Sequence, residues 1–329
     1  MWTNNTLNPP YFQFTMFADF GTSLRSICFC LCLLIYLIII VANSAIAMIV
    51  ISQKSLHRPM YIFLCCLSLN SLYGSAAFFP RFLNDVLSDA HLISRASCFA
   101  QMYVIHSCKG QEINILTIMA YDRYVAVFQP LRYNSKMSLS VVRYLLLAAV
   151  LHPVFVFGFI FYLTAKLPLC ENKLKKMYCT IWSVVELSCV DTRTLENISQ
   201  LLVALFIFLP LGFVLYTYLR ILLVCRSRSS DFKKKTLQTC IPHIVTFVNY
   251  CTAVFCEVTL SLFTIEKANM FVVAVLSLEF LLIPPVSNPL VYGLNLPQIR
   301  AVIVRRVKLF KICFKPNRTQ IDSTMTSSF

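Results

Sequence analysis

The residues best able to do chemistry in this chain are ionised side chains placed inside apolar runs. Lys109 and Glu112 stand three positions apart in "HSCKGQEINIL", and Asp122 and Arg123 follow in "MAYDRYVAVFQPLRY". At this spacing Lys109 and Glu112 share one face of a helix and can neutralise each other. A lone ammonium at the centre of a membrane costs about 3 kcal/mol, so each of these charges requires a partner.

Lys109 has two candidate partners, and the sequence leaves both open. The first is Glu112, which also needs a counter-charge, and this internal pair is the interpretation that we favour. The second is an anionic ligand, such as a carboxylate or a sulfate, held by Lys109 together with His106 one helical turn away. In that case Glu257, from another apolar run, would shape the selectivity for the ligand.

The elements that position these residues must be helices that cross a membrane. The chain has 329 residues, of which 58% are hydrophobic and 13% are charged, a composition too apolar for an ordinary soluble domain. The formal net charge of +15 comes from short basic clusters between apolar runs, which argues against a nucleic-acid partner. Only helices can span a bilayer in segments of about 20 residues, so the predicted fold is all-α.

Seven apolar segments are long enough to span a bilayer and predict a seven-helix membrane bundle. They are residues 26–51, 60–80, 97–124, 141–163, 198–224, 239–263 and 270–292. The chain then divides into an extracellular tail (1–25), the helical bundle (26–293), an amphipathic helix on the membrane surface (294–313) and a cytoplasmic tail (314–329).

The distribution of Lys and Arg predicts the orientation of the bundle. Most of the 29 basic residues follow the first, third, fifth and seventh spans, and cytoplasmic segments carry such an excess. The N-terminus is therefore expected outside the cell, with Asn4 in "NNT" and Asn197 in "NIS" as candidate glycosylation sites. The cysteines on this oxidising side make two possible disulfides. They are Cys98, Cys170, Cys179 and Cys189.

Motifs of known enzymes are missing from the sequence. It has no HExxH, no GxSxG and no phosphate-binding glycine loop, and it contains only six glycines. We therefore expect no enzymatic activity, no cofactor and no metal. A transporter or channel is an alternative, but its polar groups should follow a continuous path, whereas here the ionisable residues cluster in the third, sixth and seventh spans.

Several stretches resemble the odorant receptors among the rhodopsin-like G-protein-coupled receptors, and they occur in the order of that family. They are "LHRPMYIFLCCLSLN", "MAYDRYVAVFQPLRY", "TYLRIL", "KKKTLQTCIPH" and "PPVSNPLVYG". The details "LYGSAAFFP" and "TCIPH" are more similar to fish-type odorant receptors. The resemblance implies a receptor in the plasma membrane, in the cilia of olfactory sensory neurons, that binds a small-molecule odorant. It also implies activation of a stimulatory heterotrimeric G protein, which raises cyclic AMP.

The resemblance further implies a ligand-driven switch at the inner ends of the helices. Arg123 is expected to be held by Asp122 at rest and to turn toward Tyr218 when the sixth span moves outward. The residues expected at this switch are Asp122, Arg123, Tyr124, Tyr218, Asn288, Pro289 and Tyr292. The candidates for ligand binding are Ile105, His106, Lys109, Gly110 and Glu257.

The chain departs from its relatives at one interior position. Many rhodopsin-like receptors have a sodium-binding Asp in the second span, and the aligned residue here is Ser71, so a Lys109–Glu112 pair could replace the sodium ion. The interior polar residues expected around it are Asn43, Asn70, Ser71 and Glu112. Ile105 stands where amine receptors have an Asp, and a non-olfactory small-molecule receptor is the weaker alternative.

The segment after the last span predicts a helix on the inner membrane surface. In "LPQIRAVIVRRVKLFKICF" apolar and basic residues recur at helical spacing, as in helices that contact membrane lipid. Cys313 at its end is a candidate for palmitoylation. For the outer cysteines, the pairing to be tested is Cys98 with Cys179 and Cys170 with Cys189.

Overall fold

The computed structural model describes residues 7–16, 21–262 and 270–313, and seven long helices make up most of them. These helices are α1 (Thr22–Ser52), α2 (Pro59–Leu87), α3 (Arg95–Phe128), α5 (Leu139–Ala165), α7 (Arg193–Arg226), α8 (Ser230–Leu262) and α9 (Met270–Asn295). Each predicted span falls on one of these helices, which confirms the helical bundle.

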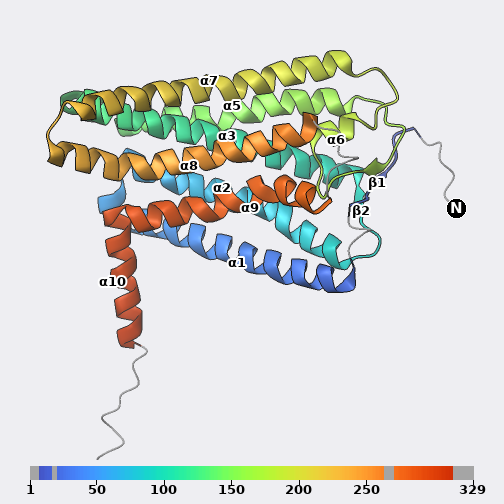
Figure 1. The fold of residues 1–329 in the computed structure, drawn as a ribbon, viewed down its shortest axis with the longest axis horizontal. Helices are drawn as coiled ribbons and strands as arrows, with labels where there is room; N and C mark the ends of the chain where they lie inside the picture. The colour runs from blue at the N-terminus through green and yellow to red at the C-terminus, as the bar shows by residue number, and fades with distance from the viewer. Residues whose placement is uncertain (1–6, 17–20, 263–269, 314–329) are drawn as a thin grey trace, which may run out of the picture.

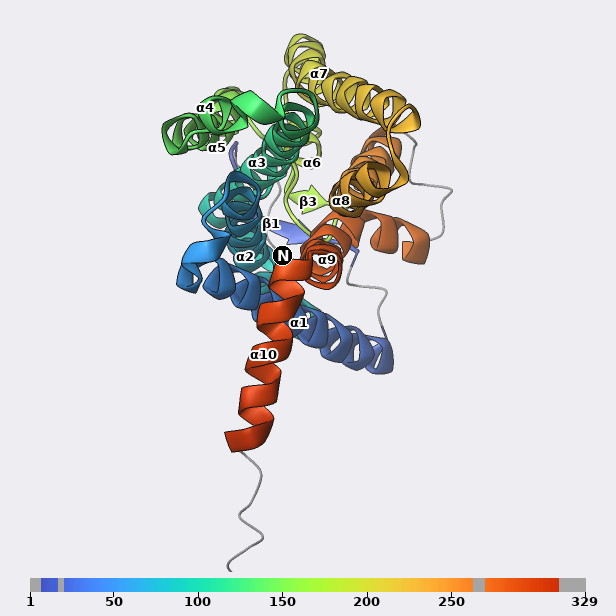
Figure 2. The same cartoon turned by 90° about the vertical axis from the view of Figure 1, so that its left-hand side faces the viewer.

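Helix α3 occupies the centre of the bundle. It packs against α2, α5, α7 and α8, while α9 joins α8 to α1 and α2. The long helices run side by side along the longest axis of the molecule (Figure 1), and the view along them shows α3 with neighbours on several sides (Figure 2). Side chains of α3 can therefore contact most of the other helices, which suits the helix that carries the ionised residues.

The outer surface of the bundle suits a lipid environment. Among the described residues, α1, α2, α5, α7 and α8 are long and apolar enough to cross a membrane. Large apolar side chains such as Val41, Phe155 and Phe208 are about two-thirds or more exposed, whereas Phe63 and Phe78 are fully buried in the interior. Burial of the exposed groups in lipid would remove the cost of their contact with water.

A small sheet covers one end of the bundle, which we call the sheet end. Its strands are β1 (Tyr11–Phe14), β2 (Leu92–Ser94) and β3 (Lys173–Leu174), with β1 in the centre, antiparallel to β2 and parallel to β3 (Figure 1). The sequence analysis expects only an extracellular tail before the first span and therefore missed strand β1. The signal for this strand is the alternation in "YFQF", where Phe12 and Phe14 are buried and their neighbours Tyr11 and Gln13 are exposed.

The opposite end, which we call the α10 end, carries short helices and α10 (Pro297–Cys313). The short helices are η1 (Lys54–Leu56), η2 (Pro130–Arg132) and α4 (Tyr133–Lys136), and a further short helix, α6 (Ile181–Val185), lies at the sheet end. Helix α10 turns away from the axis of the bundle (Figure 1). The predicted helix after the seventh span is therefore confirmed, with Ile299 buried and Arg300 exposed.

Candidate functional site

A cavity of about 80 Å³ lies inside the bundle, between α3, α5, α7, α8 and the segment that contains α6. Its lining residues are His106, Lys109, Gly110, Phe157, Ile160, Ile181, Trp182, Ser199, Val203, Phe206, Ile207, Tyr250, Val254 and Glu257. All the predicted ligand contacts except Ile105 belong to this lining. Ile105 is not part of this lining and is buried in the hydrophobic core, because successive residues of a helix point in different directions. Its contact with a ligand stays a prediction.

Glycine at position 110 allows α3 to approach its neighbours closely at this cavity. A Cβ atom on Gly110 would lie 2.7 Å from Cβ of Pro153 and 2.8 Å from Cε2 of Phe157, both on α5. Real Cβ atoms do not come so near another carbon, so any larger residue would push α3 and α5 apart. Gly110 therefore sets the width of the cavity.

An ion pair across the cavity joins α3 to α8. Lys109 Nζ donates a hydrogen bond to Glu257 Oε2 at 2.5 Å and lies 4.7 Å from the centroid of the Phe280 ring. The Tyr250 hydroxyl, also on α8, donates to the Lys109 carbonyl at 3.1 Å. The Lys109 side chain is 8% exposed and that of Glu257 is 30% exposed, so the carboxylate is the partner that remains more accessible.

This arrangement corrects the Lys109–Glu112 pair that we favoured from the sequence. Helical side chains point back toward the N-terminus of their helix, and α3 runs from the sheet end to the α10 end. The long Lys109 side chain therefore reaches toward Glu257 rather than toward Glu112, one turn further along. Glu112 has a different partner, since its Oε1 accepts a hydrogen bond from Asn288 Nδ2 on α9 at 2.8 Å.

The other interior polar residues bond mainly to backbone carbonyls. Asn43 Nδ2 donates to the Pro285 carbonyl at 2.9 Å, which Pro289 leaves without its usual helical donor because proline has no N–H group. Asn70 Nδ2 donates to the Cys108 carbonyl at 3.0 Å, and Ser71 Oγ donates to the Leu67 carbonyl at 3.1 Å. These contacts link α1 to α9 and α2 to α3, but none of them places Lys109 beside Ser71 as a substitute for sodium.

At the α10 end, the expected pair of Asp122 and Arg123 is present. Arg123 Nε donates to Asp122 Oδ2 at 2.9 Å, and the Tyr133 hydroxyl of α4 donates to Asp122 Oδ1 at 2.6 Å. Burial raises the pKa of Tyr133, and the Asp122 carboxylate raises it further, so this hydroxyl keeps its proton at neutral pH. The sequence analysis missed Tyr133 as a partner, although it ends the stretch that drew attention to Asp122.

Two tyrosines of the predicted switch bond to helix α8. The Tyr218 hydroxyl on α7 is hydrogen-bonded to Nδ1 of His243, and the Tyr292 hydroxyl on α9 lies 2.9 Å from Thr246 Oγ1. The sequence analysis assigned no role to His243 or Thr246. The signal for such a role was that each is a polar residue inside an apolar span. Tyr124 belongs to a different contact, because its ring stacks on Phe128 with the centroids 4.5 Å apart.

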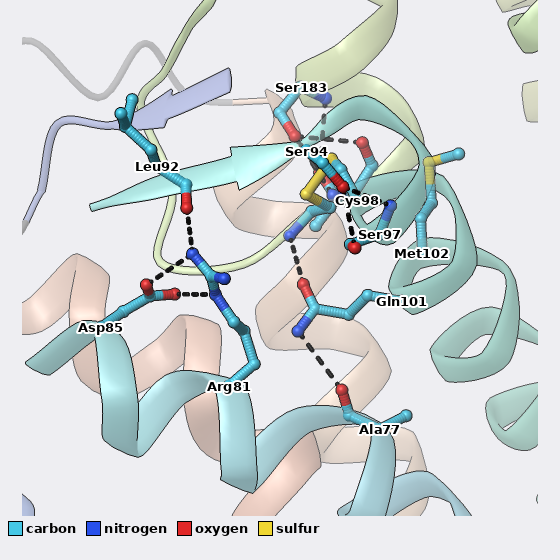
Figure 3. The surroundings of a disulfide bond; sticks show 12 residues. Ala77, Arg81, Asp85, Leu92, Ser94, Ser97, Cys98, Gln101, Met102 and Ser183 are labelled. Carbon is cyan, nitrogen blue, oxygen red and sulfur yellow. Dashed lines mark hydrogen bonds and ion pairs between the residues drawn. A yellow bond between two sulfur atoms is a disulfide. The ribbon is translucent and has the colours of Figure 1, made fainter. Parts of the chain in front are cut away.

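Two disulfides hold the long segment between α5 and α7 over the sheet end. Cys98 is bonded to Cys179 and Cys170 to Cys189, with Cα–Cα distances of 5.5 and 5.3 Å, which is the pairing that we set out to test. Gln101 adds to the first bridge, since its Oε1 accepts from the Cys179 N–H at 3.2 Å (Figure 3).

The same end is also fastened to α2. Gln101 Nε2 donates to the Ala77 carbonyl of α2 at 3.3 Å, and Arg81 binds both Asp85 and the Leu92 carbonyl of β2 (Figure 3). Strand β2 is thereby fixed to a membrane helix. Strand β1 is fixed through its pairing with β2, and β3 through its pairing with β1. The sheet is a cover for this end of the bundle.

The remaining predicted sites lie away from the cavity. Asn197 is exposed near the start of α7, at the sheet end, whereas Asn4 lies outside the described residues. Cys313 is the last residue of α10, and its side chain also lies outside the described part of the chain. An open groove of about 650 Å³ at the α10 end is lined by residues of α8, α9 and α10 that include Arg300 and Arg305.

Comparison with known proteins identifies the family of the chain. The family model described as "Olfactory receptor" matches residues 29–309. Human Olfactory receptor 10J5 is 30% identical over 305 residues, which cover 90% of this chain and 95% of that receptor. Human Olfactory receptor 52J3 is 35% identical over 269 residues, with coverage of 81% and 86%.

A mouse relative gives the same result, since Olfactory receptor 4B13 is 32% identical over 287 residues, covering 85% of this chain and 90% of its own length. These relatives are mammalian, so the narrower resemblance to fish-type receptors stays a prediction. The chain belongs to the olfactory receptor family, whose members are chemosensory G-protein-coupled receptors of the cell membrane.

Proposed function

We propose that this receptor binds a small molecule in the cavity beside Lys109 and activates a stimulatory heterotrimeric G protein, which raises cyclic AMP. One observation carries the proposal. Helices α3 and α8 both line the cavity near the sheet end, and both contribute to the cluster of Arg123 and Tyr218 partners at the α10 end. A ligand that changes how α3 and α8 meet can therefore act on the distant switch.

The proposed orientation puts the sheet end outside the cell. Disulfides persist in oxidising surroundings, and both bridges lie at this end, as does the exposed Asn197 of the glycosylation sequon. Basic residues such as Arg132, Arg226 and Arg228 lie at the α10 end, as expected for the cytoplasmic side. The natural setting that we propose is the ciliary membrane of olfactory sensory neurons.

The proposed resting state is stabilised by contacts at both ends of α3. Near the cavity, Lys109 is joined to Glu257 and Tyr250 of α8. At the other end, Arg123 is held by Asp122, while Tyr218 is bonded to His243. A ligand can shift this state only through a difference in its affinity for the resting and active arrangements. In the active arrangement Arg123 would leave Asp122 and turn toward Tyr218 and the G protein.

Helix α10 is proposed to lie on the inner leaflet. It turns away from the bundle axis (Figure 1) and exposes Arg300 and Arg305, which suit contact with anionic lipid. Palmitoylation of Cys313 would add a second anchor for this helix. The open groove between α8 and α10 is then a surface at which the G protein could bind.

The proposal is tested by screening small molecules with a cyclic-AMP reporter in cells with and without the stimulatory Gα subunit. The panel contains amino acids, bile acids, steroids and prostaglandins together with short-chain acids and amines. We expect at least one compound to raise cyclic AMP only in the cells that contain Gα. A ligand-evoked current in cells without G proteins would instead identify the chain as a channel.

A further inference from the structure

The ion pair of the cavity bears on the class of ligand; the inference rests on the proposed receptor function. Lys109 is the more deeply buried partner, with 8% of its side chain exposed against 30% for Glu257. A second lysine, Lys176, lies in the segment between β3 and α6 and is half-buried. Burial lowers the pKa of Lys176, while the carboxylates of Glu257 and Glu186 raise it. Glu257 therefore has both solvent access and a second positive charge that attracts it, whereas Lys109 depends on Glu257.

A buried hydroxyl in the same cavity has no partner among the described residues. Ser199 is 1% exposed, lines the cavity and makes no hydrogen bond within the described part of the chain. A buried hydroxyl normally finds a partner, because leaving one unpaired is unfavourable. A polar ligand group beside Ser199 would supply the missing hydrogen bond.

His106 and Tyr250 also line the cavity and are hydrogen-bonded to the carbonyls of Met102 and Lys109, and most of the remaining lining is apolar. Phe157, Ile160, Val203, Phe206 and Val254 come from α5, α7 and α8 and surround the polar groups. The cavity volume of about 80 Å³ corresponds to about five to eight water-sized groups, since each needs about 10–15 Å³ on this measure. A suitable ligand thus has a small apolar body and one polar end.

The sign of the charge on that polar end follows from the pairing of the protein groups. An incoming ammonium would take Glu257 and leave the more buried Lys109 without a counter-charge. An incoming anion could take Lys109 while Glu257, the more exposed partner, turned toward solvent and the charge of Lys176. Separation of a buried ion pair without a replacement partner is strongly unfavourable, which favours the anion.

We propose that the ligand is a small monocarboxylate with an apolar chain, which displaces Glu257 from Lys109 and hydrogen-bonds to Ser199. Displacement removes the salt bridge between α3 and α8. It also joins α8 to Lys176 of the outer segment, so the ligand changes the contact between the helices that lead to Arg123. The carboxylate thereby acts on the switch by exchanging partners within one cluster of charges.

The experiment compares four five-carbon compounds: pentanoate, pentylamine, 1-pentanol and 2-aminopentanoate. Binding is measured as the thermal stabilisation of the purified full-length receptor in lipid nanodiscs, and signalling as cyclic AMP in cells. We expect pentanoate to be the strongest ligand in both measurements. 1-Pentanol has the same chain without the charge, and it should be at least about tenfold weaker.

Variants of the charged residues should shift the response to pentanoate in opposite directions. Lys109→Met should abolish it, whereas Glu257→Gln removes the competing carboxylate and should lower the half-maximal concentration about tenfold. Lys176→Met should raise that concentration, because Glu257 then lacks its second partner. Lys175→Met changes an exposed lysine of the same segment and serves as the matched control, with no effect expected.

The double variant Lys109→Met with Glu257→Gln is the control for misfolding, because it removes both charges and leaves neither of them unpaired. It should reach the surface and bind no pentanoate; binding at wild-type strength by this variant would overturn the proposal. Weaker ligand binding in Glu257→Gln together with stronger binding in Lys109→Met would show that the ligand is an amine. Weaker binding in both variants, with 2-aminopentanoate as the best ligand, would show that the ligand is a zwitterion.

The two readouts separate this inference from the proposed function. Stabilisation by pentanoate that requires Lys109 but produces no cyclic AMP would support the ligand class and contradict the coupling. A cyclic-AMP response to other compounds, with no stabilisation by pentanoate, would support the coupling and contradict the ligand class. Stabilisation by none of the four compounds would also overturn the ligand class.

Discussion

At the scale of single residues, the proposed mechanism makes the state of the receptor depend on which group holds Arg123. Asp122 is fully buried and accepts hydrogen bonds from Arg123 and from the Tyr133 hydroxyl of α4. The second donor stabilises the negative charge of Asp122 and keeps its carboxylate in position to hold Arg123. Tyr133 thus supports the resting pair without touching any expected partner of the active state.

Removal of the Tyr133 hydroxyl should therefore raise the ligand-independent activity. A hydrogen bond to a charged group contributes about 1.5–3 kcal/mol, so Tyr133→Phe is expected to shift the equilibrium toward the active state, and to raise basal cyclic AMP, by about tenfold or more at equal surface expression. Tyr144→Phe, which removes a hydroxyl from an exposed ring on α5, is the matched control. Unchanged basal activity in Tyr133→Phe would mean that Asp122 alone suffices to hold Arg123.

The residue scale also shows what the sequence could predict about the site. The presence of Lys109 and Glu112 in an apolar span predicted that each needs a polar partner, and each has one in the structure. The identity of the partner depended on the direction of the side chains and on which helices are neighbours. Spacing along one helix carries no information about Glu257, which is separated from Lys109 by 148 positions in the sequence.

At the scale of elements, two disulfides and strand pairing link the segments at the sheet end into one cover. The Cys98–Cys179 bridge joins residues 81 positions apart and the Cys170–Cys189 bridge joins residues 19 apart. The longer loop gives the first bridge the larger entropic effect on the unfolded chain. The bond from Cys179 N–H to Gln101 adds to the same connection, so this cover depends most on the first bridge.

Loss of either cysteine of the first bridge should have the same effect. Cys98→Ser and Cys179→Ser are each expected to lower the folded stability by about 2–5 kcal/mol, and the double variant should be little worse than either. Surface expression and thermal unfolding of the purified receptor measure this effect. The control is Cys30→Ser, which changes an exposed free cysteine of α1. Strictly additive losses would contradict a direct bond between Cys98 and Cys179.

The helices and the strands differ in how well the sequence predicted them. The spans are long apolar runs whose helical form is required by the membrane, so all of them were predicted. Strands β2 and β3 contain only three and two residues, too few for a periodic pattern, and they form because β1 lies between them. Their pairing is a property of distant segments, and no local signal near residue 92 or 173 could have revealed it.

At the scale of the whole molecule, the account connects a cavity at one end with a switch at the other through α3 and α8. Contacts between these helices include the Lys109–Glu257 ion pair and the bond from Tyr250 to the Lys109 carbonyl. Helix α8 also reaches Tyr218 and Tyr292 through His243 and Thr246. In the proposed mechanism, a change at Glu257 would be transmitted along α8, which is bonded to both Tyr218 and Tyr292.

The most direct test of this account is the cyclic-AMP response of Arg123→Ala at surface expression matched to the wild type, with ligand binding measured in parallel. Arg123 lies far along α3 from the cavity lining, so the variant is expected to bind the ligand with unchanged affinity. It should nevertheless produce no ligand-evoked cyclic AMP, because the active state lacks the group that turns toward Tyr218. Full signalling by Arg123→Ala would contradict the proposed switch.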